Sequence, residues 1–354
     1  MFKKKFVTAI LLCFVLVVSA CSQGKETTTD TKGDSGDKMT TLTFSEPARI
    51  LSVAPLYVAI EQGYFKEEGI EAKIASGGGG AQVIASILSG EAQFAVSGPR
   101  SMFTPLDKGE DLVAIQSLNS ALTYQITLSK QYQDKKKISK DSSLKERIAA
   151  LDGATIGTNL VGDSGDVYTR YLMKLHGVDP NSLETVKLAG DGPKIGGMQE
   201  GIVDGGIASP PMGLQAASKD VGDVVINTME EPMYANMVWE VVFADKKFLE
   251  ENHETALKVV RPIGKGMEFT RDNPREAAES ITSYFEGIEV DILEKSLIGL
   301  ADTFKGYGEM NQEAWENAQD PLVEYGDISG VTTKQDMTED VIWTNSYIEE
   351  AFKK

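Results

Sequence analysis

The chain predicts an α/β fold built from two lobes, and three observations support this prediction. From about residue 40, short apolar runs typical of strands alternate with longer stretches whose apolar residues recur at helical spacing. The pattern of residues 90–99 recurs at residues 201–210. The length of 354 residues suits two domains, since a domain usually holds roughly 100–200 residues.

The first lobe begins with a predicted strand over residues 42–45, followed by a helix over residues 53–68. Apolar residues mark one side of this helix, and Gly69 can end it. The elements that follow are a strand over 70–75, a helix over 81–88, a buried strand over 93–96, a helix that Pro99 opens, and strands over 112–116 and 124–128.

The second lobe is predicted to repeat this alternation. Residues 135–137 are three lysines, which indicate a solvated surface excursion, and Ser143 and Glu146 have the spacing of a helix capping box. The expected elements are then a helix over 147–151, a strand over 154–158, a helix over 164–175, a strand over 185–188, a helix over 211–218, and strands over 223–228 and 236–244.

The last part of the chain is predicted to be mainly helical. Its expected helices span residues 253–271, 274–284, 291–300, 312–325 and 344–354. A lobe that is interrupted by a second lobe needs two crossovers, for which we expect strands 124–129 and 237–243. The predicted domains are therefore lobe 1 over 40–126 and 239–354, and lobe 2 over 127–238.

An internal repeat suggests that the two lobes are related. Gly90-x-Ala92-Gln93-x-x-Val96-x-x-Pro99 is matched by Gly201-x-Val203-Asp204-x-x-Ile207-x-x-Pro210. Each copy predicts a helix end, a buried strand and a proline at the start of the next helix. The alternative is that βαβ units in every α/β fold share this pattern of glycine and proline at the ends of their elements.

The N-terminal segment predicts export and lipid anchoring. Three lysines precede an apolar run over residues 6–18, and Val18-Ser19-Ala20-Cys21 resembles the bacterial lipobox. We expect a signal peptide over 1–20 and a flexible tether over 21–39 that starts at a lipidated Cys21. The alternative is an ordinary secretory signal. The predicted location is the extracytoplasmic face of a bacterial cell membrane, with the lipid anchor as the only membrane contact.

Composition argues against several classes of function. The chain has 53 acidic and 35 basic residues, so its formal charge of −18 disfavours nucleic acid as a partner. Its only cysteines are Cys13 and Cys21 and its only histidines are His176 and His253, which rules out a four-cysteine zinc site. We expect no metal and no cofactor.

No motif indicates an enzyme. The chain lacks the GxSxG nucleophile elbow and the phosphate-binding GxxxxGK[ST] loop, and Gln82 stands where a dinucleotide fingerprint that begins at Gly77 requires glycine. His176 precedes Gly177 at a predicted helix end, where a capping role is expected. His253 lies among glutamates and is expected on the surface.

Turns that follow predicted strands indicate a ligand cleft. The carboxyl ends of strands and the amino ends of helices surround one crevice in open α/β folds, and free N–H groups there suit an anionic or polar ligand. Each glycine turn taken singly is equally explained by turn geometry. Arg49 and Arg100 are candidate anion clamps, while Phe103 and other aromatic residues are candidate walls, for each of which core packing is the favoured explanation.

Residues 54–70 (APLYVAIEQGYFKEEGI) closely resemble the first helix of the nitrate/sulfonate/taurine-type substrate-binding proteins of ABC importers. This family also includes binders of thiamine-pyrimidine precursors. Residues 86–98, 152–157 and 341–348 are similar to later elements of the family. The resemblance implies a bilobal type II periplasmic-binding-protein fold, a ligand between the lobes, and delivery to an ABC permease with its ATPase. The mature chain lacks the cysteines that fungal relatives use in pyrimidine synthesis.

The turns and the resemblance together define the candidate ligand-binding residues. We expect hydrogen-bond donors at Ser97, Gly98, Asn159, Gly162 and Ser164. The full set is Ser45, Glu46, Arg49, Tyr57, Gly78, Gly79, Ser97, Gly98, Arg100, Tyr124, Asn159, Val161, Gly162, Asp163, Ser164, Ser209 and Trp239.

The expected function is a monomeric, lipid-anchored solute-binding component of an ABC importer that captures a small oxoanion or organosulfonate. The alternative ligand is a planar pyrimidine-like thiamine precursor, stacked on Tyr57 or Trp239 with Glu46 accepting from its amine. The first loop, Phe44-Ser45-Glu46-Pro47, lacks the tryptophan that pyrimidine binders tend to carry. An extracytoplasmic enzyme and a passive adhesin are two further alternatives.

Overall fold

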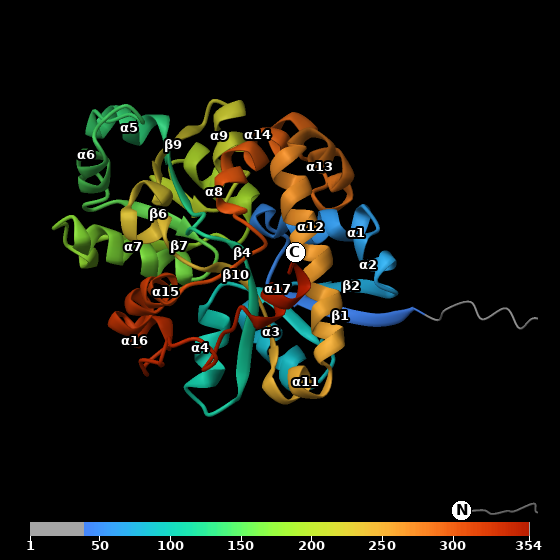
Figure 1. The fold of residues 1–354 in the computed structure, drawn as a ribbon. Coiled ribbons are helices and arrows are strands. Elements are labelled where there is room, and N and C mark those ends of the chain that lie inside the picture. The colour runs from blue at the N-terminus through green and yellow to red at the C-terminus, as the bar shows by residue number, and fades with distance from the viewer. Residues whose placement is uncertain (1–38, 354) are drawn as a thin grey trace, which may run out of the picture. The chain divides into compact units, whose positions relative to one another are not determined.

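Two five-stranded sheets with the same strand order form the framework of the protein (Figure 1). The computed structural model describes residues 39–353, so the predicted signal peptide, the tether and Cys21 lie outside the described residues, apart from Met39 at the end of the tether range. In order across the first sheet lie β2 (Ile70–Ser76), β1 (Thr40–Glu46), β3 (Phe94–Ser97), β10 (Trp239–Asp245) and β4 (Leu112–Asn119). In order across the second lie β7 (Glu184–Lys187), β6 (Thr155–Thr158), β8 (Gly205–Ala208), β5 (Gln125–Ser129) and β9 (Gly222–Asn227).

Each sheet contains one antiparallel strand that the chain enters directly from the other sheet. The first three strands of each sheet are parallel, whereas β10 and β5 run antiparallel to their neighbours. Strand β5 follows β4 of the first sheet, and β10 follows β9 of the second, so the chain crosses between the sheets twice. The predicted α/β fold with two crossover strands is confirmed, and β3 and β8, the strands of the internal repeat, hold the same place in their sheets.

Helices connect the strands and form most of the last third of the chain. They are α1 (Ala54–Glu61), α2 (Tyr64–Glu67), α3 (Gly79–Leu88), α4 (Arg100–Leu106), α5 (Lys130–Lys136), α6 (Leu144–Ala149), α7 (Ser164–Leu175), α8 (Asp191–Gln199), α9 (Met212–Ser218), α10 (Pro232–Ala235), α11 (Lys246–Glu251), α12 (His253–Asp272), α13 (Pro274–Ser280), α14 (Val290–Leu300), α15 (Gln312–Glu324), α16 (Gly326–Ser329) and α17 (Ser346–Ala351). Short 3-10 turns span Leu51–Val53, Pro180–Ser182, Thr228–Glu230, Thr282–Tyr284 and Ala301–Thr303.

Two predicted elements differ in the structure. The helix predicted over 53–68 is split into α1 and α2, because Gly63 takes a left-handed φ of 79° that glycine adopts at little cost. The helix predicted over 274–284 ends at Ser280. The lysines of 135–137 lie on the surface as expected, where Lys135 and Lys136 end α5 and Lys137 caps it. The predicted capping box of Ser143 and Glu146 is confirmed at the start of α6.

Two apolar cores cover the faces of the first sheet. One packs Phe44 and Phe94 against α1 and α12. The other begins at Trp239 and Phe243 on the opposite face and continues into the second sheet and onto α15. Helix α15 lies beside α7 of the second sheet (Figure 1). The Tyr168 hydroxyl of α7 donates a 2.8 Å hydrogen bond to the Ala318 carbonyl of α15.

Candidate functional site

The carboxyl ends of the parallel strands carry most of the predicted site residues. Glu46 ends β1, Ser97 ends β3, and Asn159 follows β6, while Gly78 and Gly79 begin α3 and Ser164 begins α7. Where a helix begins after the carboxyl end of a strand, its first N–H groups are free to bind a ligand. The polar groups fall into three clusters: one on each sheet and one that joins them.

The cluster on the first sheet is built around the fully buried carboxylate of Glu46. Its Oε1 accepts a 2.6 Å hydrogen bond from Arg49 Nη1, and its Oε2 accepts a 2.6 Å hydrogen bond from the Tyr57 hydroxyl. Burial raises the pKa of Glu46, and these two partners lower it in part. The Tyr57 ring stacks on Tyr284 at 4.6 Å and is fully buried, so in this structure Tyr57 packs in the core and holds Glu46.

Glu240 is a second buried carboxyl group, which the sequence analysis missed. It is 3% exposed, its φ is 49°, and its Oε2 has no hydrogen-bond partner among the described residues. Burial, together with a smaller effect of the charge of Glu46, raises the pKa of Glu240 to about 8. The available signal was an acidic residue inside an otherwise apolar strand, since β10 reads WEVVFAD.

Aromatic side chains line the junction between the two sheets. Trp239 is 2% exposed and meets Tyr124 and Tyr168 edge to face, at centroid distances of 5.2 and 5.7 Å. A Cβ at Gly98 would lie 3.0 Å from Trp239 Cη2, so any larger residue there would press on the tryptophan ring. Trp239 Nε1 has no partner among the described residues and remains a free donor.

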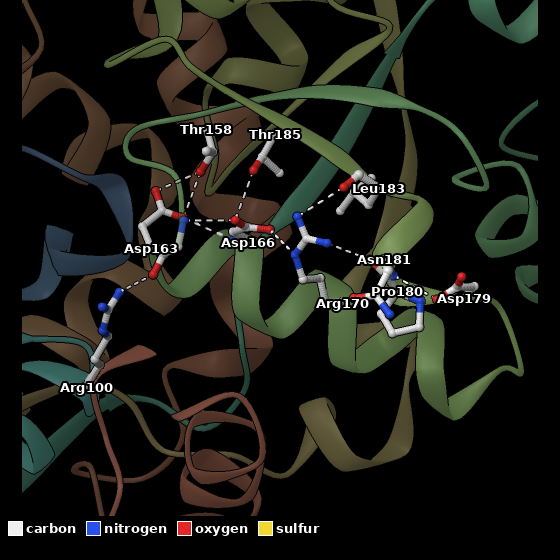
Figure 2. Close-up of polar contacts among 11 residues, drawn as sticks. Arg100, Thr158, Asp163, Asp166, Arg170, Asp179, Pro180, Asn181, Leu183 and Thr185 are labelled. Carbon is white, nitrogen blue, oxygen red and sulfur yellow. Dashed lines mark hydrogen bonds and ion pairs between the residues drawn. The ribbon is translucent and has the colours of Figure 1, made fainter. Parts of the chain in front are cut away.

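Arg100, the first residue of α4, joins the first sheet to the second. Its Nη1 donates to the Gly162 carbonyl at 2.6 Å, and its Nε donates to the Ser329 carbonyl at the end of α16 at 2.7 Å. Figure 2 shows Arg100 pointing towards the loop that carries Asp163. Burial lowers the pKa of Arg100, and the charge of Asp163 opposes that shift.

The loop that receives Arg100 is held by hydrogen bonds from α7. Asp163 caps α7 by accepting from the Asp166 N–H at 3.0 Å and also accepts from Thr158 Oγ1 at 2.7 Å. Asp166 is buried, accepts from the Gly162 N–H at 2.8 Å and pairs with Arg170 Nε at 2.7 Å (Figure 2). The Gly162 carbonyl is therefore presented to Arg100 by a fixed loop.

The cluster on the second sheet contains a buried lysine, which the sequence analysis also missed. Lys194 is 1% exposed and donates from Nζ to Asn159 Oδ1 at 2.9 Å, and the Gly190 N–H donates to the same oxygen at 3.0 Å. Burial lowers the pKa of Lys194, and the charge of Asp191 opposes that shift. The signal was modest: Lys194 is the only basic residue of α8 and follows a glycine turn.

The remaining predicted residues are scattered around these clusters. Ser97 Oγ donates to Ser101 Oγ at 2.8 Å, Ser209 shares a 2.8 Å hydrogen bond with Thr123, and Ser45 is buried in β1. Val161 is 56% exposed at the tip of the β6–α7 loop. Within residues 39–353 no three metal-ligating side chains are grouped, and no helix there is long and apolar enough to span a membrane.

The two sheets have the same strand order, and the chain crosses between them twice, through β5 and β10. This arrangement is the bilobal type II periplasmic-binding-protein fold. The chain belongs to the NMT1/THI5-like family, since the model of that family matches residues 51–277, more than half of its length. This confirms the family relationship that the resemblance of residues 54–70 predicted.

Individual relatives are distant but cover nearly the whole chain. YtlA of Bacillus subtilis (strain 168), whose name describes it provisionally as a binding protein, is 22% identical over 329 residues, which are 91% of this chain and 90% of YtlA. The periplasmic aliphatic sulphonate binding protein SsuA from Escherichia coli has a TM-score of 0.66 at 15% identity, covering 87% of this chain and 99% of SsuA.

Two further structures show that proteins of different function have a similar fold. The periplasmic nitrate-binding protein NrtA from Synechocystis PCC 6803 has a TM-score of 0.65 at 16% identity, covering 89% of this chain and 88% of NrtA. The desulfurization enzyme DszB has a TM-score of 0.61 at 12% identity, covering 88% of this chain and 98% of DszB. The fold is thus shared by binding proteins and by an enzyme, so function has to be argued from the site.

Proposed function

We propose that this protein is the extracytoplasmic solute-binding component of an ABC importer and that it takes a small oxoanion or organosulfonate between its two lobes. The observation that carries the proposal is Lys194, a buried cation at the carboxyl end of β6 with no carboxylate within 4 Å among the described residues. A buried ammonium without an ion-pair partner favours an anionic ligand.

Hydrogen-bond donors around Lys194 support the same ligand class. Asn159 uses Oδ1 to accept from Lys194 and Gly190, which leaves its amide hydrogens for a ligand. The first turns of α7 and α8 bring further N–H groups to this side of the second sheet. The names of SsuA and NrtA, a sulphonate binder and a nitrate binder of the same fold, agree with this choice.

A planar pyrimidine-like ligand is the second candidate, and the carboxylate of Glu46 favours it. An exocyclic amine would donate to such an acceptor, and Trp239 would offer a stacking surface and a free Nε1 donor. Its weakness is that both Glu46 oxygens already accept hydrogen bonds, from Arg49 and Tyr57. The oxoanion remains the leading candidate for this reason.

Delivery would follow from hinge closure. A ligand that contacts both lobes stabilises the closed form, which we propose an ABC permease and its ATPase recognise. The lobes would follow the predicted boundaries, with 40–126 and 239–354 in one and 127–238 in the other. We propose that Cys21 carries the lipid anchor and that the protein acts as a monomer.

A thermal-shift panel tests the proposed function. The chain from Cys21 onward, with Cys21→Ser to prevent acylation, is heated with about 1 mM nitrate, alkanesulfonates, aromatic sulfonates, aminopyrimidines or carboxylates. A ligand of micromolar affinity should stabilise the fold by about 4 kcal/mol, which is a shift of several degrees. Lys194→Met should remove the response to anions, while Lys187→Met, at an exposed residue of β7, should keep it. An absence of any shift would refute the proposal.

A further inference from the structure

One part of the surface of this acidic protein is basic. Residues 130–147, which run from the start of α5 into α6, contain seven basic and three acidic residues, whereas the whole chain has a formal charge of −18. Two of the basic residues are paired: Lys130 with Asp220 and Asp223, and Arg147 with Glu230. The other five, which we call the lysine patch, are Lys135, Lys136, Lys137, Lys140 and Lys145.

The lysine patch is one exposed surface on a fixed base. None of its ammonium groups forms an ion pair with a carboxylate of residues 39–353. Four of its lysines are exposed, and Lys136, which is partly buried, donates to the Asp152 carbonyl at 2.8 Å. The Tyr132 hydroxyl of α5 donates to the Ala150 carbonyl at the end of α6 at 2.8 Å, so the two helices are held together at one corner of the molecule (Figure 1).

The end of helix α5 explains only part of the lysine patch. Cations in the last turn of a helix interact with the negative end of its dipole, which accounts for Lys135 and Lys136. Lys140 and Lys145 lie beyond that turn. Lys137 caps the helix with a φ of 56°, a left-handed conformation that glycine adopts at lower cost. A lysine at this position therefore indicates a use for its charge.

The chemistry of the lysine patch fits a surface of phosphate headgroups. A lysine ammonium is a hydrated point charge on a flexible stem, so it can meet phosphates without a fixed bidentate geometry. Residues 130–149 contain none of the exposed large apolar side chains found within residues 39–353, so nothing there would insert into hydrocarbon. Contact through this patch would be electrostatic and confined to the headgroups.

The predicted anchor would bring the lysine patch close to a membrane. The tether expected over residues 21–39 can span at most about 65 Å. A folded body of this chain length is roughly 50 Å across. A lipidated Cys21 would therefore keep the patch within reach of the headgroups, at an effective concentration that the tether length sets.

We propose that the lysine patch is a docking surface for an anionic phospholipid membrane, which holds the α5–α6 corner of the anchored protein at the headgroups. This inference rests on the proposed lipid anchor and is independent of which solute the protein binds. Each lysine at an anionic surface raises the membrane partition coefficient about fivefold. The patch thus adds a second, salt-sensitive attachment to the one that the anchor supplies.

Vesicle flotation tests the proposal on the chain from Cys21 onward with Cys21→Ser, which carries no acyl chain. At about 50 mM NaCl the parent should bind vesicles of phosphatidylglycerol and phosphatidylcholine in equal parts, but not vesicles of phosphatidylcholine alone. Binding should disappear at about 0.5 M NaCl because salt screens the charges. The triple variant Lys135→Gln, Lys137→Gln and Lys140→Gln should lower the partition coefficient about 100-fold, from three fivefold losses.

A matched triple variant assigns the effect to the lysine patch. Lys66→Gln, Lys258→Gln and Lys295→Gln together remove the same charge from exposed lysines of α2, α12 and α14, and should leave vesicle binding within about twofold of the parent. Equal binding of the parent to both kinds of vesicle, or an equal loss in the two triple variants, would overturn the inference.

Failure of this inference can be told from failure of the proposed function. No vesicle binding by the parent would overturn the docking surface, and retention on immobilised polyphosphate in that case would assign the patch to a soluble polyanion. Both triple variants should keep the thermal-shift response to anions, because the lysine patch lies outside the three clusters of the candidate site. The solute-binding function therefore stands or falls by the thermal-shift panel alone.

Discussion

The guanidinium of Arg100 holds the backbone carbonyl of Gly162 at 2.6 Å, which connects a helix of the first sheet with a loop of the second. The two residues are 62 positions apart, and the same guanidinium reaches the Ser329 carbonyl, 229 positions away. Arg100 therefore ties the start of α4 both to the β6–α7 loop and to the end of α16.

Replacing Arg100 by alanine should open the ligand-free protein. Hydrogen bonds to charged groups contribute about 1.5–3 kcal/mol each, so the loss of two should lower the unfolding free energy by about 3–6 kcal/mol, and the radius of gyration from X-ray scattering should rise. Arg275→Ala is the control, because Arg275 forms exposed ion pairs that contribute at most about 1 kcal/mol. Unchanged scattering and stability in Arg100→Ala would contradict the bridging role.

Gly162 should tolerate no side chain. Its φ is 78°, and a Cβ there would lie 2.9 Å from Ile328 Cγ2 and 3.2 Å from the Ile328 carbonyl oxygen. Gly162→Ala should cost about 1–2 kcal/mol for the left-handed backbone and a further 1–3 kcal/mol, roughly, for the overlap. Gly177→Ala is the matched control, since Gly177 has a φ of 75° and open space around its Cβ. Equal losses in urea unfolding would refute the packing argument.

Glu240 should make the stability of the protein depend on pH. Its pKa is about 8 in the folded protein and near 4.5 when exposed, so between these values the folded state keeps a proton that the unfolded state has released. The unfolding free energy should therefore decrease as pH rises from about 4.5 to 8. Glu240→Gln should flatten this decrease in urea unfolding measured at pH 5 and pH 8. Parallel pH profiles for parent and variant would show that Glu240 is ionised in the fold.

Cys21 should be required for membrane attachment. Acyl chains contribute about 0.8 kcal/mol per buried CH2, and no helix of residues 39–353 can span a membrane. Cys21→Ala should therefore move the protein from the membrane fraction to the soluble fraction of fractionated bacteria. Cys13→Ala is the control, because Cys13 lies within the predicted signal peptide and its loss should leave attachment intact. Membrane retention of Cys21→Ala at the parent level would exclude this anchor.

Much of the fold could be predicted because its signals are local. Apolar periodicity and glycine punctuation located nearly all the strands, and helix α7 spans the predicted residues 164–175. The break at Gly63 was missed because a continuous apolar face does not reveal a left-handed residue within it. The repeated motif also indicated that the two lobes are related, and its strands β3 and β8 hold the same place in their sheets.

The candidate site was predictable only in outline. The carboxyl ends of strands and the turns and helix starts after them can be found from the sequence, and Glu46, Arg100 and Asn159 lie there. Glu240 and Lys194 were missed because a glutamate in an apolar strand or a lysine in a helix is ordinary until its surroundings are known. Their importance arises from burial without an ion-pair partner in the part of the chain that the structure describes, which depends on neighbours from distant strands.

Short-range patterns in the amino-acid sequence thus predicted the α/β class, the order of its elements and the family, because each follows from residues close together in the chain. Three-dimensional packing established which charges meet. It paired Arg49 with Glu46, bridged Arg100 to Gly162 and left Glu240 Oε2 without a hydrogen-bond partner within residues 39–353. Desolvation and Coulomb interactions depend on distances between residues far apart in the sequence, so the electrostatic character of the candidate site appears only in the folded protein.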